Sequence, residues 1–201
     1  MSLPPQEEQA EILQAVLRLY RQFGPDKVAM DDIAKATGRS RTSLYYYYKN
    51  RDEVFRAAID AIVLDIAKDL RKAVADVQPL EEKVFTFCVA KLRISREWKL
   101  ILNSMWATME SKERLGHLKT TEGLHRKLVH QESLVLKEIL AAAAEKKEIR
   151  VLSDEETDNW VFVITSGIRG IRNELPDQNL TQAVKASIRV LSDMATKWLK
   201  K

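Results

Sequence analysis

Residues 30–51, MDDIAKATGRSRTSLYYYYKNR, constrain the fold most strongly, because they predict two short helices joined by a tight turn. The first helix, residues 31–36, has an acidic pair at its start, where the helix dipole favours negative charge, and an Ile-Ala pair for a buried face. Gly38 follows, and glycine readily adopts the left-handed conformation that ends a helix at such a corner. Ser40 is a suitable N-cap for a second helix, expected over about residues 41–48.

The second helix contains a run of tyrosines, residues 45–48, that cannot all share one role. Each residue advances about 100° around a helix, so the four rings point in different directions. Leu44 and Tyr48 are four residues apart and are expected to face the domain core, with Tyr47 beside them. The residues expected on the outer face are Arg41, Thr42, Tyr45, Tyr46 and Lys49. Their guanidinium, hydroxyl, phenol and ammonium groups suit phosphate oxygens and base edges.

The charge of this stretch points to the same partner. Residues 33–51 contain no Asp or Glu, and their cations are Lys35, Arg39, Arg41, Lys49 and Arg51. A basic run is often only a solvated helix face, but a helix-turn-helix pattern around it favours a surface for a polyanion. We therefore predict contacts with double-stranded DNA from Ser40, Arg41, Thr42, Ser43, Tyr45, Tyr46, Tyr47, Lys49 and Arg51.

At these residues the sequence resembles the tetracycline-repressor (TetR) family of bacterial transcriptional regulators. The features shared with the family are Ile33-Ala34, Gly38-Arg39-Ser40, Leu44-Tyr45, Tyr48 and Asn50-Arg51. The resemblance implies a three-helix DNA-binding domain, a helical domain that holds a small-molecule inducer, and a homodimer on a palindromic operator. It also implies a cytoplasmic repressor that needs no cofactor and that the ligand releases from DNA.

The sequence departs from the family pattern at several positions. Ala29 replaces the usual Ser or Thr cap, so the first helix of the motif needs another cap. Arg39 replaces an apolar turn residue and is expected to extend outward to phosphate. Tyr47 stands where histidine is frequent, and Arg51 replaces a lysine. These changes affect which operator sequence is read rather than whether DNA is bound.

The whole chain is predicted to be all-α, with a helix-turn-helix domain over residues 1–50 and a helical ligand-binding and dimerisation domain over residues 51–201. Periodic apolar residues predict further helices over 6–23, 51–77, 80–95, 97–109, 121–147, 154–173 and 180–200. Asn50 and Glu53 have the spacing of a capping box for the fourth helix. The polar segment 110–120 is expected to be a loop or part of a broken helix.

One apolar set suits a pocket for a hydrophobic or aromatic small molecule. Its members are Phe87, Cys88, Trp98, Leu102, Met105, Trp106 and Met109. Residues at helical spacing also fill ordinary cores, so a pocket and a plain core both remain open from the sequence.

The C-terminal helices carry a second hypothesis, a homodimer interface. Leucine, isoleucine and valine recur in a four-three pattern over residues 180–198, which is typical of helices that pack at shallow angles. The predicted interface comprises Gly167, Gly170, Ile171, Val184, Ile188, Leu191 and Trp198. Packing within one chain would use the same pattern, and the sequence does not separate the two.

Other classes of protein receive little support. The net charge of +4 is modest, the single cysteine excludes an intramolecular disulfide, and no apolar run approaches the length of a membrane span. The three histidines, His117, His125 and His130, lack the spacing of a zinc pair. No phosphate loop or nucleophile elbow is present, so we do not expect an enzyme or a metal site. A helical small-molecule-binding or interaction protein that does not bind DNA is the alternative.

Overall fold

The computed structural model describes residues 6–107, 111–174 and 180–200, with side chains described at these positions except Gln6, Asp26 and 100–122. The chain forms two compact units, Met1–Asp65 with Trp98–His125 and Ile66–Glu97 with Arg126–Lys201. Three long helices each contribute to both units. The expected domain boundary after residue 50 therefore stays a prediction.

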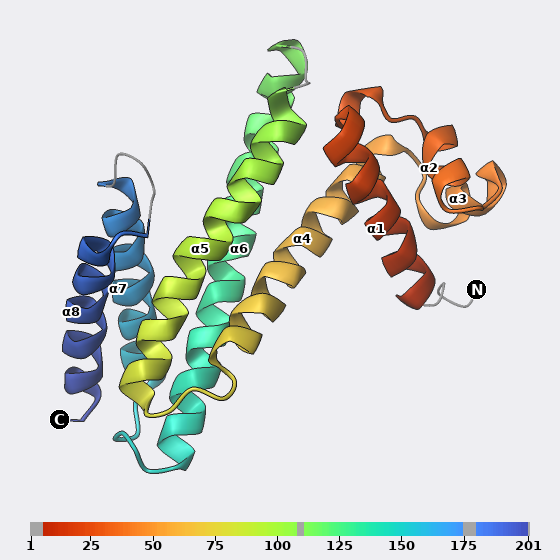
Figure 1. The fold of residues 1–201 in the computed structure, drawn as a ribbon. Helices are drawn as coiled ribbons and strands as arrows, with labels where there is room; N and C mark the ends of the chain where they lie inside the picture. Colours follow the sequence, from red (N-terminus) through yellow and green to blue (C-terminus); the bar gives the residue numbers. More distant parts are fainter. Residues whose placement is uncertain (1–5, 108–110, 175–179, 201) are drawn as a thin grey trace. The chain divides into compact units, whose positions relative to one another are not determined.

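Every regular element of the described residues is helical (Figure 1). In chain order they are α1 (Gln6–Phe23), the 3-10 helix η1 (Pro25–Lys27), α2 (Met30–Ala36), α3 (Arg41–Tyr47), α4 (Arg51–Val74), α5 (Leu80–Ala107), α6 (Ser111–Glu145), α7 (Asp154–Asn173) and α8 (Gln182–Leu199). This confirms the predicted all-α class. No helix of the described residues is both long and apolar enough to cross a membrane.

The first unit contains the helix-turn-helix. Helix α2 packs against both α1 and α3. The core receives fully buried side chains from all three helices, including Ile12, Ile33 and Leu44. Burying one such side chain stabilises a fold by about 1.5–3 kcal/mol. Tyr20 adds an aromatic contact to Phe55 at the start of α4, with ring centroids 5.9 Å apart. Leu44 therefore anchors α3 in a core that it shares with α1 and α2.

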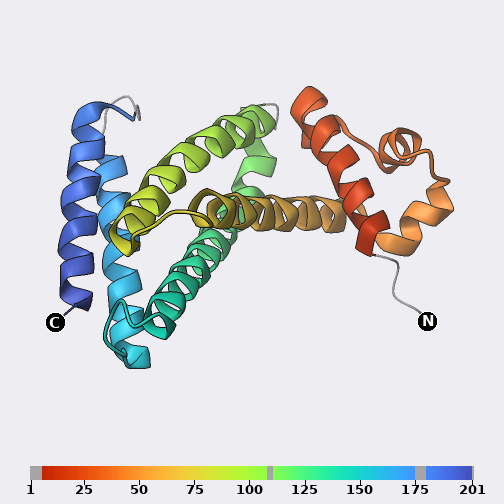
Figure 2. The same cartoon turned by 60° about the horizontal axis from the view of Figure 1, so that its bottom comes forward.

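The second unit is built from parts of α4, α5 and α6 together with α7 and α8. Helices α7 and α8 pack side by side, as both ribbon views show (Figures 1 and 2). Their contact includes a hydrogen bond from Trp160 Nε1 to the carbonyl of Ala195, 3.0 Å long. Elsewhere in this unit Lys91 and Glu132 form a buried ion pair with 2.7 Å between Nζ and Oε2. Each charge offsets the cost of burying the other.

Several predicted helix boundaries agree with the structure, and others were wrong. Helices α1 and α7 have the predicted limits. The predicted break near residue 96 is absent, because α5 continues through it. Residues 111–120, expected as a loop or part of a broken helix, belong to α6, which is continuous from Ser111 to Glu145. The physical reason is that no proline lies between Pro79 and Pro176, and one mid-helix glycine costs only about 1 kcal/mol relative to alanine.

Candidate nucleic-acid interface

The corner between α2 and α3 depends on Gly38, whose φ of 65° lies in the left-handed region. Two backbone hydrogen bonds close the end of α2, from Arg39 N to Ala34 O at 2.9 Å and from Gly38 N to Lys35 O at 3.2 Å. This is the pairing of a Schellman motif. The predicted role of Gly38 is confirmed, because a residue with a Cβ would be strained at this φ.

The two motif helices have different caps. Ala29 has no side-chain acceptor, so α2 relies on Asp32, whose Oδ2 accepts a 2.8 Å hydrogen bond from the Ala29 N–H. Helix α3 has the predicted Ser40 cap, in which the Ser40 hydroxyl oxygen accepts from the Ser43 N–H at 3.1 Å. These contacts fix where α3 begins.

The inner and outer faces of α3 are those that its sequence predicts. Leu44 is fully buried and Tyr48 is 5% exposed, whereas Tyr45 is 40% and Tyr46 is 51% exposed. Among the remaining predicted contacts Arg41, Thr42 and Lys49 are also exposed. Helix α3 carries no acid in its first turn. The outer face is therefore a set of donors open to solvent.

Arg41 lies beside an acid of the preceding helix. Its Nε is 3.1 Å from Asp31 Oδ1, and its Nη1 donates to Asp31 Oδ2 at 3.5 Å. The guanidinium carbon also lies 5.7 Å from the centre of the Tyr45 ring. A hydrogen bond with Tyr45, and then the charge of Asp31, raise the pKa of Arg41. Both members of the ion pair remain more than half exposed, so water screens their attraction.

Arg39 does not extend toward solvent, and this expectation was wrong. Its Nη1 lies 3.2 Å from Glu8 Oε2, its Nη2 lies 3.5 Å from Glu11 Oε2, and its side chain is only 21% exposed. Tyr47 also donates a hydrogen bond to Glu8, and this bond raises the pKa of the phenol. Glu8 of α1 therefore ties the turn and the end of α3 together.

Sequence reasoning missed the acids that organise this surface. Glu8 is 31 residues from Arg39 and 39 from Tyr47, so no local pattern connects them. Asp31 was assigned only a helix-dipole role. Its ten-residue separation from Arg41 crosses the glycine corner, and only the turn geometry brings the two together.

The segment after α3 contains two further residues that the sequence predicts to contact DNA, Lys49 and Arg51. The Glu53 N–H donates to Asn50 Oδ1 at 2.9 Å, as a capping box requires. The reciprocal bond is shifted by one residue, because Glu53 Oε2 accepts from the Lys49 N–H at 2.7 Å. Lys49 is exposed and Arg51 is half-buried at the start of α4. The backbone of this segment is thus fixed while the Lys49 side chain stays on the surface.

The predicted small-molecule pocket is only partly described. Phe87 and Cys88 are fully buried in the second unit, and burial raises the pKa of the Cys88 thiol to about 12. Trp98 belongs to the first unit, where the Arg21 guanidinium lies 5.5 Å from its ring centre. Three predicted members, Leu102, Met105 and Trp106, lie in α5 beyond the described side chains, and Met109 lies outside the described residues.

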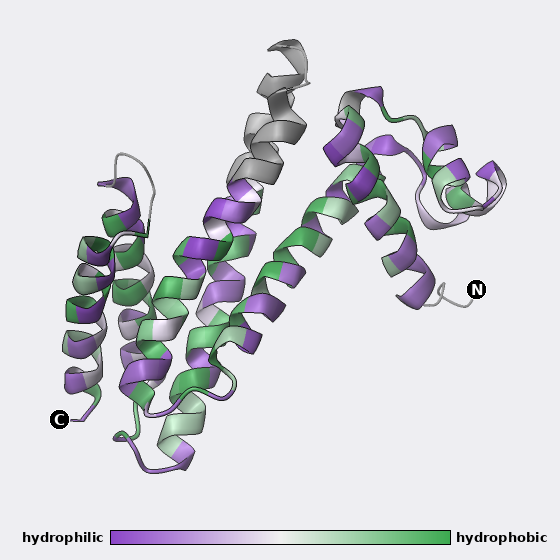
Figure 3. Cartoon of the chain, in the orientation of Figure 1, coloured by the Kyte–Doolittle hydropathy of each residue, from purple (hydrophilic) through white to green (hydrophobic). Residues whose placement is uncertain are grey.

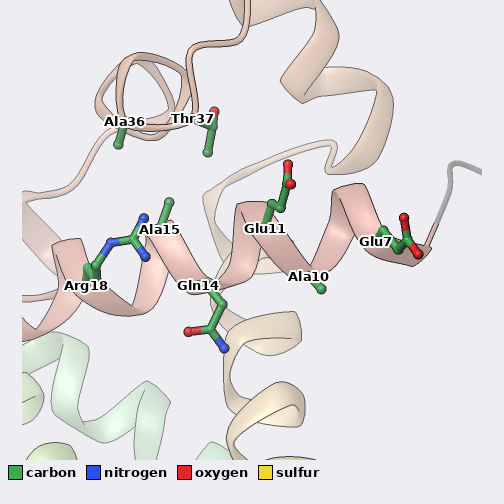
Figure 4. Close-up of a pocket in the computed structure, with 8 residues that line it drawn as sticks. All are labelled: Glu7, Ala10, Glu11, Gln14, Ala15, Arg18, Ala36 and Thr37. Atoms are coloured by element: carbon green, nitrogen blue, oxygen red, sulfur yellow. The ribbon is translucent and has the colours of Figure 1, made fainter.

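A groove of about 640 Å³ lies beside α1 and α2 in the first unit (Figure 4). Its lining residues are Glu7, Ala10, Glu11, Gln14, Ala15, Arg18, Ala36 and Thr37. Figure 4 shows Glu11 and Ala15 on the side of α1 that faces Ala36 and Thr37. None of the predicted pocket residues contributes to this groove.

Some of the predicted dimer residues are buried within the chain, and others are exposed. Val184 and Ile188 are buried within the chain, and a Cβ on Gly167 would lie 2.8 Å from Leu191 Cδ2. Ile171 is half-buried. In contrast, Trp198 is 41% exposed, and a Cβ on Gly170 would meet nothing within 4 Å.

Sequence reasoning missed four apolar residues that share this exposure. They are Phe162 and Val163 on α7 and Val190 and Met194 on α8, each more than half exposed. Green, hydrophobic positions run along both helices in Figure 3. The sequence pattern did not single them out, because the buried apolar residues of α8 recur at the same helical spacing as the exposed ones.

Comparisons with known proteins agree with this geometry. Residues 12–58 match the model of the bacterial regulatory proteins of the tetR family. An HTH-type transcriptional regulator of Mycobacterium tuberculosis is 31% identical over 86 residues, which is 43% of either chain. The negative transcriptional regulator of the biofilm operon, IcaR of Staphylococcus epidermidis, is 32% identical over 50 residues, 25% of this chain and 27% of IcaR. The chain thus spans less than half the length of these curated relatives.

Solved structures extend the likeness of the fold to nearly the whole chain. The TetR family repressor AlkX from Dietzia sp. superimposes with a TM-score of 0.62 and 19% identity, over 96% of this chain and 98% of AlkX. The fatty acid degradation regulator FadR from Bacillus halodurans superimposes with a TM-score of 0.51 and 15% identity, over 98% of this chain and 97% of FadR. With the glycine corner and the capped α3, residues 12–58 match the helix-turn-helix segment of the tetR family of bacterial regulatory proteins.

Proposed function

We propose that the protein is a DNA-binding transcriptional regulator that acts as a homodimer on a palindromic operator in the cytoplasm. One observation carries this proposal, the exposed outer face of α3. It presents the Arg41 guanidinium and the Tyr45 and Tyr46 phenols to solvent, on a helix whose inner side is buried. These groups are donors for phosphate oxygens and base edges. A major groove is wide enough to admit such a helix.

Lys49 and Arg51 are proposed to bind phosphates next to the bases that α3 reads. Lys49 directly follows the C-cap of α3 and is exposed. The role proposed for Arg51 rests on its position at the first residue of α4. Arg39 is not included, since Glu8 and Glu11 already compensate its charge.

The salt dependence of DNA binding tests this proposal. If a dimer makes about six to ten phosphate contacts, its affinity for a duplex should fall by roughly three to five decades between 50 and 200 mM salt. Lys49→Ala should lower the slope of log affinity against log salt by about 0.9 for each protomer bound. The measurement is fluorescence anisotropy with a labelled duplex selected from a randomised pool.

Lys72→Ala is the matched control, because Lys72 is an exposed lysine in the last turn of α4. Its slope should equal that of the unchanged protein. A response to salt that is flat, or equally lowered by Lys49→Ala and Lys72→Ala, contradicts the proposed interface.

The homodimer is proposed to form through α7 and α8. Its support is the exposed apolar set on these neighbouring helices, namely Phe162, Val163, Val190, Met194 and Trp198. Contiguous exposed apolar surface commonly marks a protein interface. A two-fold dimer presents the same patch from each chain, and it suits operator half-sites about 34–36 Å apart.

We further propose that the protein is a repressor that a small-molecule inducer releases from DNA. The relative IcaR is named a negative transcriptional regulator, and AlkX is named a repressor. The sequence-based pocket around Trp98 and Trp106 remains the proposed location of the inducer. A non-DNA-binding helical protein is the alternative, and a failed selection from the randomised duplex pool would favour it.

A further inference from the structure

Asp31 is an acid in an unexpected place for a surface that binds a polyanion. It stands in the first turn of α2, and its carboxylate reaches across the glycine corner to Arg41. The contacts are 3.1 Å from Nε and 3.5 Å from Nη1. A free carboxylate here would repel phosphate, so its position beside an outward-facing arginine calls for a specific role.

The ion pair leaves part of the guanidinium available. Arginine has five N–H donors, of which Asp31 contacts Nε and one donor of Nη1, and Tyr45 forms one further hydrogen bond. Two donors remain, which is the number that two hydrogen bonds to one base require. The Tyr45 ring, 5.7 Å from the guanidinium carbon, further limits the directions that Arg41 can take. The group is therefore restrained while its donors stay exposed.

The charge of the pair favours one kind of acceptor. Arg41 and Asp31 together carry no net charge. The pair therefore attracts a phosphate less strongly than an arginine without an acidic neighbour would. The edge of a neutral base does not suffer the same repulsion from Asp31. In the major groove guanine presents two neighbouring acceptors, O6 and N7, which match two donors of one guanidinium.

We propose that Asp31 is a positioning residue that orients Arg41 to read a guanine in the major groove of the operator. This inference rests on the proposed function, because it assigns one base contact within the same interface. Asp31 lowers affinity for arbitrary DNA through its charge, and it raises discrimination at one base pair of each half-site. Arg41 is the specificity-determining residue, and Asp31 acts through it.

The test selects duplexes from a randomised pool with the full chain, with the Asp31→Asn variant and with the Arg41→Lys variant. Lysine keeps the charge of Arg41 but lacks the paired donors of a guanidinium. The unchanged protein should select one G·C pair per half-site and prefer it over A·T by about 5- to 150-fold, the range expected for one good bidentate contact. Both variants should bring this ratio towards one.

Salt titration supplies a second readout. With Asp31→Asn, the released Arg41 is free to contact phosphate, so the slope of log affinity against log salt should increase by about 0.9 per half-site. Asp52→Asn is the matched control, because Asp52 is an exposed acid in the first turn of α4 and the net charge changes equally. This control should keep the G·C preference.

The outcomes separate the two proposals. Loss of the G·C preference in Asp31→Asn and Arg41→Lys, but not in Asp52→Asn, supports the inference. An unchanged preference in either of the first two variants overturns it while DNA binding by the protein stands. If thermal melting shows that Asp31→Asn does not fold, Arg41→Lys decides alone, since Arg41 is exposed. A protein that selects no duplex overturns both proposals.

Discussion

The outer face of α3 and the outer face of α7 and α8 both expose large side chains, but their chemistry differs. On α3 the exposed aromatic residues are Tyr45 and Tyr46, with Arg41 and Lys49 next to them. On α7 and α8 the exposed large apolar residues are Phe162, Val163, Val190, Met194 and Trp198. The first set brings donors and positive charge, and the second brings apolar area with few groups that bind water.

This difference supports the two interfaces proposed above. A face of phenols and cations keeps its water when it is alone and exchanges that water for phosphates and bases on DNA. Removing an apolar face from water is favourable by about 25 cal/mol for each Å² buried. The α3 face therefore suits a polyanion that is bound and released, and the α7 and α8 face suits a lasting contact with a second copy.

The strongest test of this contrast changes one residue on each face. Phe162→Glu should weaken dimerisation by about 100-fold or more, because each chain would bury a charge in place of an aromatic ring. Tyr46→Ala should weaken binding to the selected duplex and leave dimerisation unchanged. Sedimentation equilibrium and anisotropy measure the two effects.

Leu64→Glu is the control for added charge, since Leu64 is a similarly exposed apolar residue on α4. It should leave the dimer intact. Dimers of undiminished stability in Phe162→Glu would show that the apolar face serves another purpose.

A second comparison distinguishes the two sides of α8. Ile188 is fully buried and Met194 is 68% exposed. Ile188→Ala should lower the free energy of unfolding by about 2–5 kcal/mol, whereas Met194→Ala should change it by less than about 0.5 kcal/mol. Urea unfolding in a Phe162→Glu background measures both without a contribution from dimer dissociation. Equal losses would mean that the described inner and outer faces of α8 are wrong.

The smallest effect concerns the glycines of α7. Gly170→Ala should stabilise the same monomeric background by up to about 1 kcal/mol, because alanine favours the helix and no atom lies within 4 Å of the new Cβ. Gly167→Ala should gain less, since its Cβ would meet Leu191 Cδ2 at 2.8 Å and that side chain must move. Thermal melting compares the two variants. A larger gain at Gly167 contradicts this reading of the helix contact.

Much of the fold follows from local patterns. The apolar spacing and breakers predicted α1 and α7 with their observed limits, and Gly38 and Ser40 predicted the corner and the start of α3. Continuity of α5 was missed, because a polar stretch without proline resembles a loop in sequence but still forms a helix. Helix period also predicted that Leu44 is buried and that Tyr45 is exposed.

The sequence by itself determined the helical class, the helix-turn-helix and the outward donors of α3, since these depend on residues within a few turns of one another. Only the tertiary structure decided which charges are compensated. Glu8 holds Arg39 and Tyr47 from another helix, and Asp31 reaches Arg41 around a corner. The tertiary structure also decided that Ile188 faces inward and Met194 outward. Such choices depend on distances between segments far apart in the chain, and helical periodicity carries no information about those distances.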